Sequence, residues 1–117
     1  MDGDFTKYLP HMDVNDGKAR IMNNMKLYMT LLGKFKGREM TDTLLAAMSA
    51  NDSAVVVQTA HALRGTASNL SFPVLQEITS EIEALGKAGQ DSSHLSEKLD
   101  TTMAELDAAI ADLTASV

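Results

Sequence analysis

The segment from Asp52 to Leu70 carries apolar residues at every third or fourth position, which is the spacing that one face of an α-helix produces. This stripe comprises Val56, Ala60, Leu63, Ala67 and Leu70. Asp52 is a preferred N-cap residue, so the helix is predicted to begin directly after it. A long amphipathic helix therefore occupies the middle of the chain, with its stripe on the core.

His61 does not belong to this stripe. At about 100° per residue it points roughly 150° away from the centre of the stripe. Its imidazole is therefore expected to stand in water, midway along the helix and opposite the core. Gln58, Arg64, Gly65 and Ser68 lie within two turns of His61 at helical spacing, so they are predicted to surround it on the same face.

Gly65 is unexpected on this face. A glycine inside a helix costs about 1 kcal/mol relative to alanine, and packing does not demand a small residue on a solvent face. One interpretation is steric access, in which a partner must come close to His61. The alternative is a glycine that is merely tolerated at an exposed position.

Apolar stripes of the same period predict four further helices. They comprise Met25, Tyr28, Leu32 and Phe35; Met40, Leu44, Ala47 and Met48; Leu75, Ile78, Ile82 and Leu85; and Leu95, Leu99, Met103, Leu106, Ile110 and Leu113. The first is expected to end near Gly37, and the second to begin at Thr41 and end at Asn51. Before them we expect a helical turn that includes Phe5, Tyr8 and Leu9. A short helix that carries Ala19, Ile21 and Met22 is expected to follow, capped by Asn15 and Asp16.

The remaining boundaries follow from turn and cap residues. Residues 71–72 are expected to make a tight turn, and Pro73 suits the first turn of the next helix. Gly86 and Gly89 are expected to stop that helix. Residues 91–93 offer caps for the last helix.

No segment alternates apolar and polar residues as a strand would, and the loops are short, so neighbouring long helices should pack antiparallel. The predicted fold is all-α: an up-down antiparallel four-helix bundle with short additional N-terminal helices. A length of 117 residues predicts one domain, residues 1–117.

Composition narrows the function. A net charge of −6 argues against nucleic acid as a partner. The sequence lacks cysteine, and His11 and His94 have no partners at metal-ligand spacing, so no metal site is expected. No signal peptide is visible, and no apolar run approaches the roughly 20 residues that span a bilayer. We therefore expect a cytoplasmic protein without membrane contact.

The run AHALRG, followed by TASNLSFPVL and EIE, resembles the signature of histidine-containing phosphotransfer (HPt) domains. The matching positions are His61, Leu63, Arg64, Gly65, Ala67, Leu70, Ile82 and Glu83. Two positions depart from the pattern. Arg64 stands where lysine is more usual, which keeps the charge but changes its shape. Ser71 stands where a glycine usually follows the leucine.

The resemblance implies that His61 accepts a phosphoryl group from a receiver-domain aspartate and passes it to another receiver domain. A neutral imidazole, with an ordinary pKa near 6.5, is a competent nucleophile at pH 7. Arg64 would offset the phosphate charge, Gly65 would give access, and Gln58 and Ser68 would contact the partner. The sequence holds no phosphate-binding glycine loop for ATP. The protein would then be a phosphoryl carrier rather than an enzyme.

The same resemblance names the partners and the setting. They are response-regulator receiver domains and a hybrid sensor histidine kinase of a bacterial two-component phosphorelay. The chain itself would be a monomer without a cofactor, since Mg²⁺ is expected only in the receiver.

Three alternatives remain open. A sensor-kinase dimerisation domain also carries a phosphorylated histidine, but that family has an acidic residue directly after it, where this chain has Ala62. The phosphotransfer domain of a chemotaxis-type kinase is a close relative of the main interpretation. The third alternative is a helical protein-interaction module whose exposed histidine is incidental.

Overall fold

The computed structural model describes residues 5–116, and every regular element in this range is helical. The predicted all-α class is therefore confirmed. Two short 3₁₀ helices accompany six α-helices. They are η1 (Thr6–Tyr8), α1 (Val14–Ala19), α2 (Met25–Lys34), α3 (Gly37–Ser49), α4 (Ser53–Leu70), α5 (Pro73–Lys87), η2 (Ser93–Leu95) and α6 (Ser96–Ala115).

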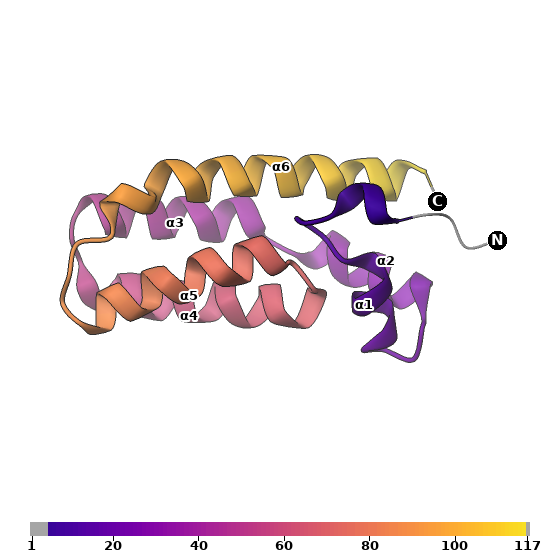
Figure 1. The fold of residues 1–117 in the computed structure, drawn as a ribbon, viewed down its shortest axis with the longest axis horizontal. Coiled ribbons are helices and arrows are strands. Elements are labelled where there is room, and N and C mark those ends of the chain that lie inside the picture. Colours follow the sequence, from indigo (N-terminus) through magenta and orange to yellow (C-terminus); the bar gives the residue numbers. More distant parts are fainter. Residues whose placement is uncertain (1–4, 117) are drawn as a thin grey trace.

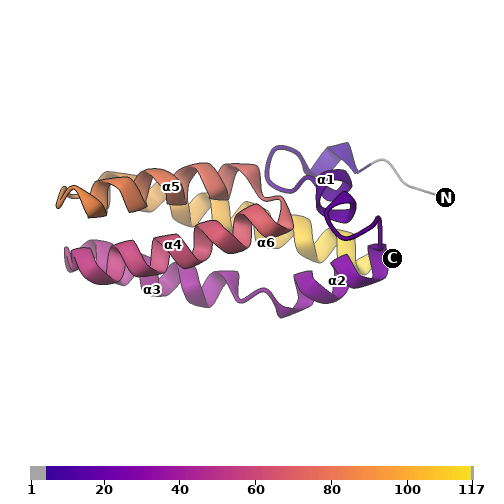
Figure 2. The same cartoon turned by 90° about the horizontal axis from the view of Figure 1, so that it is seen from below.

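The four longest helices, α3 to α6, lie side by side along the long axis of the molecule (Figures 1 and 2). Both α4 and α6 pack against α3 and against α5, and the most extensive of these contacts joins α4 to α5. The short helices α1 and α2 lie at the end of the molecule where α4 turns into α5 (Figure 1). The molecule is elongated, with extents of 48 × 23 × 20 Å.

The apolar stripes predicted from the sequence form the core. All five stripe residues of α4 are buried, as are Leu75, Ile78 and Ile82 of α5. Tyr28 of α2 is also buried, and its hydroxyl donates to the carbonyl oxygen of Leu70 at 2.7 Å. Because a buried hydroxyl without a partner would be costly, this hydrogen bond fixes α2 against the end of α4.

The turn between α4 and α5 explains why glycine would suit position 71. Ser71 adopts the left-handed conformation, with φ 63° and ψ 60°, which costs a non-glycine residue about 1 kcal/mol or more. Its hydroxyl donates to Asp16 at 2.5 Å, and its carbonyl accepts from the backbone of Asp13 at 2.8 Å. These bonds offset the strain and hold α1 on the turn. Pro73 then opens α5, as predicted.

Two predicted helix starts were wrong. Asp13, rather than Asn15 or Asp16, caps α1 by accepting from the backbone of Asp16, and α1 ends at Ala19. The α3 helix begins at Gly37 rather than Thr41. Gly37 is buried, and a Cβ there would collide with the Phe35 ring and with Met103 of α6, so the glycine permits close packing at the start of α3.

Of the two glycines expected to stop α5, Gly89 does so and Gly86 does not. The α5 helix runs through Gly86 to Lys87, and Gly89 follows the C-cap residue with φ +70° and donates its backbone N–H to the carbonyl of Gly86 at 3.1 Å. The predicted caps of the last helix were wrong. The last helix starts after η2 without a side-chain cap, while Asp91 binds Ser93 within the loop. Gly86 is buried against α4 and serves close helix packing rather than termination.

Substitution of Gly86 should therefore behave unlike substitution of an open helical glycine. A Cβ there would come within 2.9 Å of Val57 Cγ2 and 3.1 Å of Val56 Cγ1. Overpacking costs about 1–3 kcal/mol, against a helix-propensity gain of about 1 kcal/mol. We expect Gly86→Ala to lower the melting temperature and the matched variant Gly33→Ala, whose Cβ would meet nothing within 4 Å, to raise it. Thermal denaturation checks both. Equal stabilisation by the two variants would contradict the packing role.

Candidate functional site

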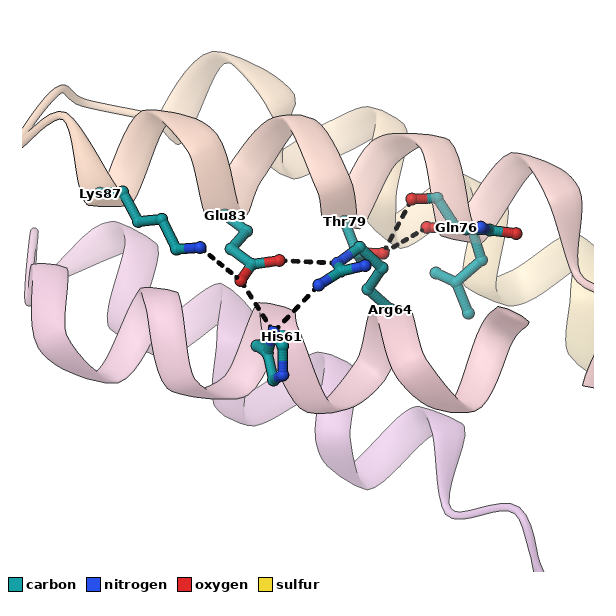
Figure 3. A network of polar contacts seen from close by, with 7 residues as sticks. His61, Arg64, Gln76, Thr79, Glu83 and Lys87 are labelled. Atoms are coloured by element: carbon teal, nitrogen blue, oxygen red, sulfur yellow. Dashed lines mark hydrogen bonds and ion pairs between the residues drawn. The ribbon is translucent and has the colours of Figure 1, made fainter. Parts of the chain in front are cut away.

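His61 lies midway along α4, and its side chain is 65% exposed. The prediction that it stands outside the buried stripe is confirmed. The sequence pattern did not predict a contact with another helix, yet the Nδ1 atom of His61 lies 2.9 Å from Oε2 of Glu83 on α5 (Figure 3). The residue is thus oriented by the neighbouring helix while most of its ring stays accessible.

Glu83 is the centre of this cluster of polar side chains. Its side chain is only 6% exposed, yet three basic groups reach its carboxylate. Arg64 Nε donates to Oε1 at 2.7 Å, and Lys87 Nζ lies 3.3 Å from Oε2, the oxygen that also contacts His61 (Figure 3). Each oxygen of the buried carboxylate therefore has a charged or polar partner.

This surrounding keeps Glu83 ionised. Burial by itself raises the pKa of the carboxyl, but the hydrogen bonds from Arg64, His61 and Lys87 outweigh it and lower the pKa to about 2. The carboxylate is therefore negative at neutral pH, and it can accept hydrogen bonds but not donate them.

The charge on Glu83 determines which nitrogen of His61 is nucleophilic. Because the carboxylate only accepts, its contact with Nδ1 places the ring hydrogen on that atom. The lone pair of the neutral imidazole is then on Nε2, which points away from the cluster in Figure 3. Arg64 Nη2 lies 3.0 Å from the same Nδ1, but it cannot donate to a nitrogen that already carries hydrogen. The geometry thus favours an exposed nucleophile at Nε2.

Arg64 is less exposed than the sequence predicts. It lies beside His61, as expected, but its side chain is only 34% exposed and is bound to Glu83. Lys87 was missed altogether. The signal that could have found it is its position one turn after Glu83 on the same helix, where an i,i+4 ion pair forms readily. Glu83 was noted only as a position of the family pattern.

The other three candidates do not join the cluster. Gly65 is exposed, and a Cβ there would meet nothing within 4 Å, so the space beside His61 is open. Gln58 is exposed and Ser68 is half-buried, and the side chains of both lie outside the described contacts of His61, Arg64 and Glu83. The structure therefore brings together His61 and Arg64 but not Gln58 and Ser68.

The two remaining histidines differ in burial. His94 is exposed, whereas His11 is largely buried and contacts Glu105 of α6 through Nε2. Within residues 5–116 the structure contains no group of three or more His, Cys, Asp or Glu side chains that could hold a metal ion. No helix in the described range is long and apolar enough to cross a bilayer.

A family model described as the Hpt domain matches residues 36–116, well over half of the chain. The chain belongs to the HPt family. The matched range includes all four residues of the cluster, His61, Arg64, Glu83 and Lys87. HPt domains are phosphocarrier modules of two-component phosphorelays rather than kinases, so the chain has a phosphotransfer role.

Comparison with solved structures finds the HPt domain of a sensor hybrid histidine kinase from Shewanella. The two share a TM-score of 0.82 over 97% of this chain and 98% of that chain, at 18% sequence identity. At that identity the likeness is evidence for the fold alone. No curated protein matches the chain.

The ionised state of Glu83 predicts a pH dependence of stability. The pKa of Glu83 is about 2 in the folded protein, below its ordinary value of 4.5. The ionised carboxylate therefore stabilises the folded state fully above pH 4.5, and this contribution is lost as the pH falls towards 2. Glu83→Gln should cost about 1–3 kcal/mol at pH 7, and this deficit should shrink between pH 4.5 and 2. Melting temperatures across this range give the measurement.

The matched control is Glu81→Gln, which changes an exposed carboxyl on the same helix that has no ion pair in the described structure. It should leave stability nearly unchanged at every pH. A deficit of Glu83→Gln that stays constant down to pH 2 would show that the charge of Glu83 contributes nothing.

Proposed function

We propose that this HPt chain, as an up-down antiparallel four-helix bundle with short N-terminal helices, is a phosphorelay intermediate. His61 accepts a phosphoryl group from a receiver-domain aspartate and passes it to another receiver domain. The observation that carries the proposal is the accessible Nε2 of His61, with Nδ1 held by the ionised Glu83.

In the forward step the lone pair of Nε2 attacks the phosphorus of the aspartyl phosphate. The P–N bond forms as the P–O bond to the aspartate breaks, and the aspartate leaves as a carboxylate. The imidazole thereby gains positive charge while Nδ1 keeps its hydrogen. Glu83 stabilises that charge across the 2.9 Å contact, and the reverse sequence returns the phosphoryl group to a second receiver.

Arg64 and Lys87 balance the charge of the product. A phosphorylated side chain carries about −1.5 to −2 charge near neutral pH. Both cations already lie at the His61–Glu83 pair, so the phosphoryl group arrives where positive charge is in place. Arg64 lies close enough to contact His61 and Glu83 together, which makes it the main charge partner in this proposal.

The docking face proposed for the receiver is the exposed side of α4 around His61, including Gln58, Gly65 and Ser68, with the adjacent part of α5. The proposed partners are receiver domains and a hybrid sensor histidine kinase. Signalling contacts of this kind are small, about 1,200 Å² or less in total, so we expect a transient complex with a cytoplasmic monomer. The receiver would supply the Mg²⁺.

His61→Gln should abolish phosphoryl transfer from purified phosphorylated receiver domains, because no other nucleophile in the described structure has this surrounding. Loss of acid-labile label on the protein is the measurement. His94→Gln, which removes an exposed histidine elsewhere, is the matched control and should accept label like the parent. Undiminished acid-labile labelling of His61→Gln would refute the assignment.

Substitutions of Gly65 should have opposite effects on the stability of the fold and on the rate of phosphoryl transfer. Gly65→Ala should stabilise the fold by about 0.5–1 kcal/mol, because it removes a helix-interior glycine in open space. The added methyl group lies one turn from His61, where the reacting atoms must approach within about 3–3.5 Å, and a misplacement of about 1 Å can cost about 100-fold in rate. We expect modestly slowed transfer for Gly65→Ala and severely slowed transfer for Gly65→Gln.

Gly33 provides matched controls for these variants. It also lies inside a helix, and a Cβ there meets nothing within 4 Å, but it is on α2 rather than beside His61. Gly33→Ala should raise the melting temperature to a similar extent, and neither it nor Gly33→Gln should slow transfer. If Gly65→Gln transfers at the parent rate, access is not the reason for the glycine.

A further inference from the structure

A second concave site lies away from the His61 cluster. It is a pocket of about 610 Å³ between the two residues that follow α1, the C-terminal part of α2 with the residue after it, and the C-terminal half of α4. Its apolar lining includes Ile21, Leu31 and Phe35, and α4 contributes the polar side chains of Thr66 and Asn69. The volume is within the range of about 300–1,000 Å³ that is usual for binding sites.

Hydrogen bonds between the surrounding elements fix the walls of this pocket. The buried Tyr28 hydroxyl joins α2 to Leu70 of α4, and the Ser71 hydroxyl joins the end of α4 to Asp16 of α1. These contacts hold α2, and the α1 helix that leads into Arg20 and Ile21, against the end of α4. A partner would therefore meet a largely pre-formed surface, which reduces the entropy cost of binding.

The charge of this region is opposite to that of the rest of the chain. Residues 14–38 carry six Lys or Arg and one Asp, whereas the remainder carries four Lys or Arg and fifteen Asp or Glu. Arg20 and Lys34 line the pocket itself. Arg20 uses Nε on Asp16 at 3.0 Å, and Lys34 has no carboxylate within ion-pair distance among residues 5–116. The complementary occupant is therefore anionic.

An exposed apolar side chain extends the site beyond the pocket. Leu27 is 42% exposed and lies one helical turn before Leu31 on the same face of α2. A small anion inside the pocket would leave Leu27 uncovered, whereas a segment of polypeptide crossing the pocket can cover it.

We propose that this pocket docks an acidic peptide segment that carries one bulky apolar side chain. The apolar side chain enters between Ile21, Leu31 and Phe35, and flanking carboxylates pair with Arg20 and Lys34. The site uses no residue of the His61 cluster, so it stands independently of the phosphotransfer proposal.

The probe is a capped, fluorescently labelled peptide, Glu-Asp-Phe-Asp-Glu, titrated with the full chain at about 0.15 M salt and followed by fluorescence anisotropy. We expect saturable binding that weakens at least tenfold when the central Phe is replaced by Ser or when the protein carries Lys34→Glu. His61→Gln should bind the peptide like the parent.

The matched control is Lys26→Glu, an exposed lysine of α2 that does not line the pocket. It lies eight residues from Lys34, about 12 Å along the helix axis, which exceeds the Debye length of about 8 Å at this salt. Lys26→Glu should weaken binding less than about twofold.

Three results would overturn the proposal. Equal weakening by Lys26→Glu and Lys34→Glu would indicate general attraction to a basic surface. Competition by phenylpropionate as strong as by unlabelled peptide would indicate a small-molecule site. Absence of saturable binding at millimolar protein would exclude peptide docking at this pocket.

Discussion

The buried carboxylate of Glu83 is the interaction on which the arrangement of the α4–α5 pair depends. An ion with 6% exposure is stable only when hydrogen bonds and opposite charges replace the water it has lost. Arg64 and His61 of α4 and Lys87 of α5 provide them. The requirement sets the relative register of the two helices, because a slip of one turn would remove both α4 partners from the carboxylate.

Residues before the family match brace this hairpin from one end. Tyr28 and Asp16 bind the last residues of α4 and the turn after it, and Tyr8 of η1 donates to Asp112 of α6 at 2.8 Å. Ser71 can hold its strained conformation because its hydroxyl donates to Asp16 and its carbonyl accepts from the backbone N–H of Asp13. The N-terminal segment is thus part of the structure that positions α4, and it also forms the wall of the second pocket.

The sequence was informative wherever local periodicity determines the outcome. The stripe from Val56 to Leu70 predicted which face of α4 is buried, and that in turn predicted the exposed position of His61. Asp52 and Pro73 predicted helix starts because cap chemistry is local. Gly86 misled for the opposite reason. Its role is close contact with Val56 and Val57 on α4, and no local pattern distinguishes such a glycine from one that ends a helix.

The contacts of Glu83 also depend on packing. The sequence shows that Glu83 follows the buried Ile82 and that Lys87 lies one turn later, but it does not show which α4 residues face α5 at that level. Arg64 consequently looked exposed, although a long arginine side chain beside a helix seam can bury its stem while its guanidinium reaches a partner. The buried face of α4 could be predicted from the helical period of its apolar residues. The ion pair between Arg64 and Glu83 could not, because it depends on how α4 and α5 are aligned along their length.

Under the proposed function the same cluster would have to accommodate two charge states, and its composition allows this. Before transfer, the two cations Arg64 and Lys87 face one carboxylate beside a neutral His61. After the proposed transfer, a phosphoryl group would add about −1.5 to −2 charge beside them. Glu83 is too buried to move into water, so the adjustment falls on its cations. Lys87 is 64% exposed, so its ammonium group can turn toward the proposed phosphoryl group. The Arg64 guanidinium lies near Nδ1 of His61 but cannot donate a hydrogen bond there. Its free nitrogens can therefore also turn toward the phosphoryl group while Nε stays bound to Glu83. An arginine at position 64 can therefore serve both anions at once with separate nitrogens, which the single ammonium group of the more usual lysine cannot do with the same geometry.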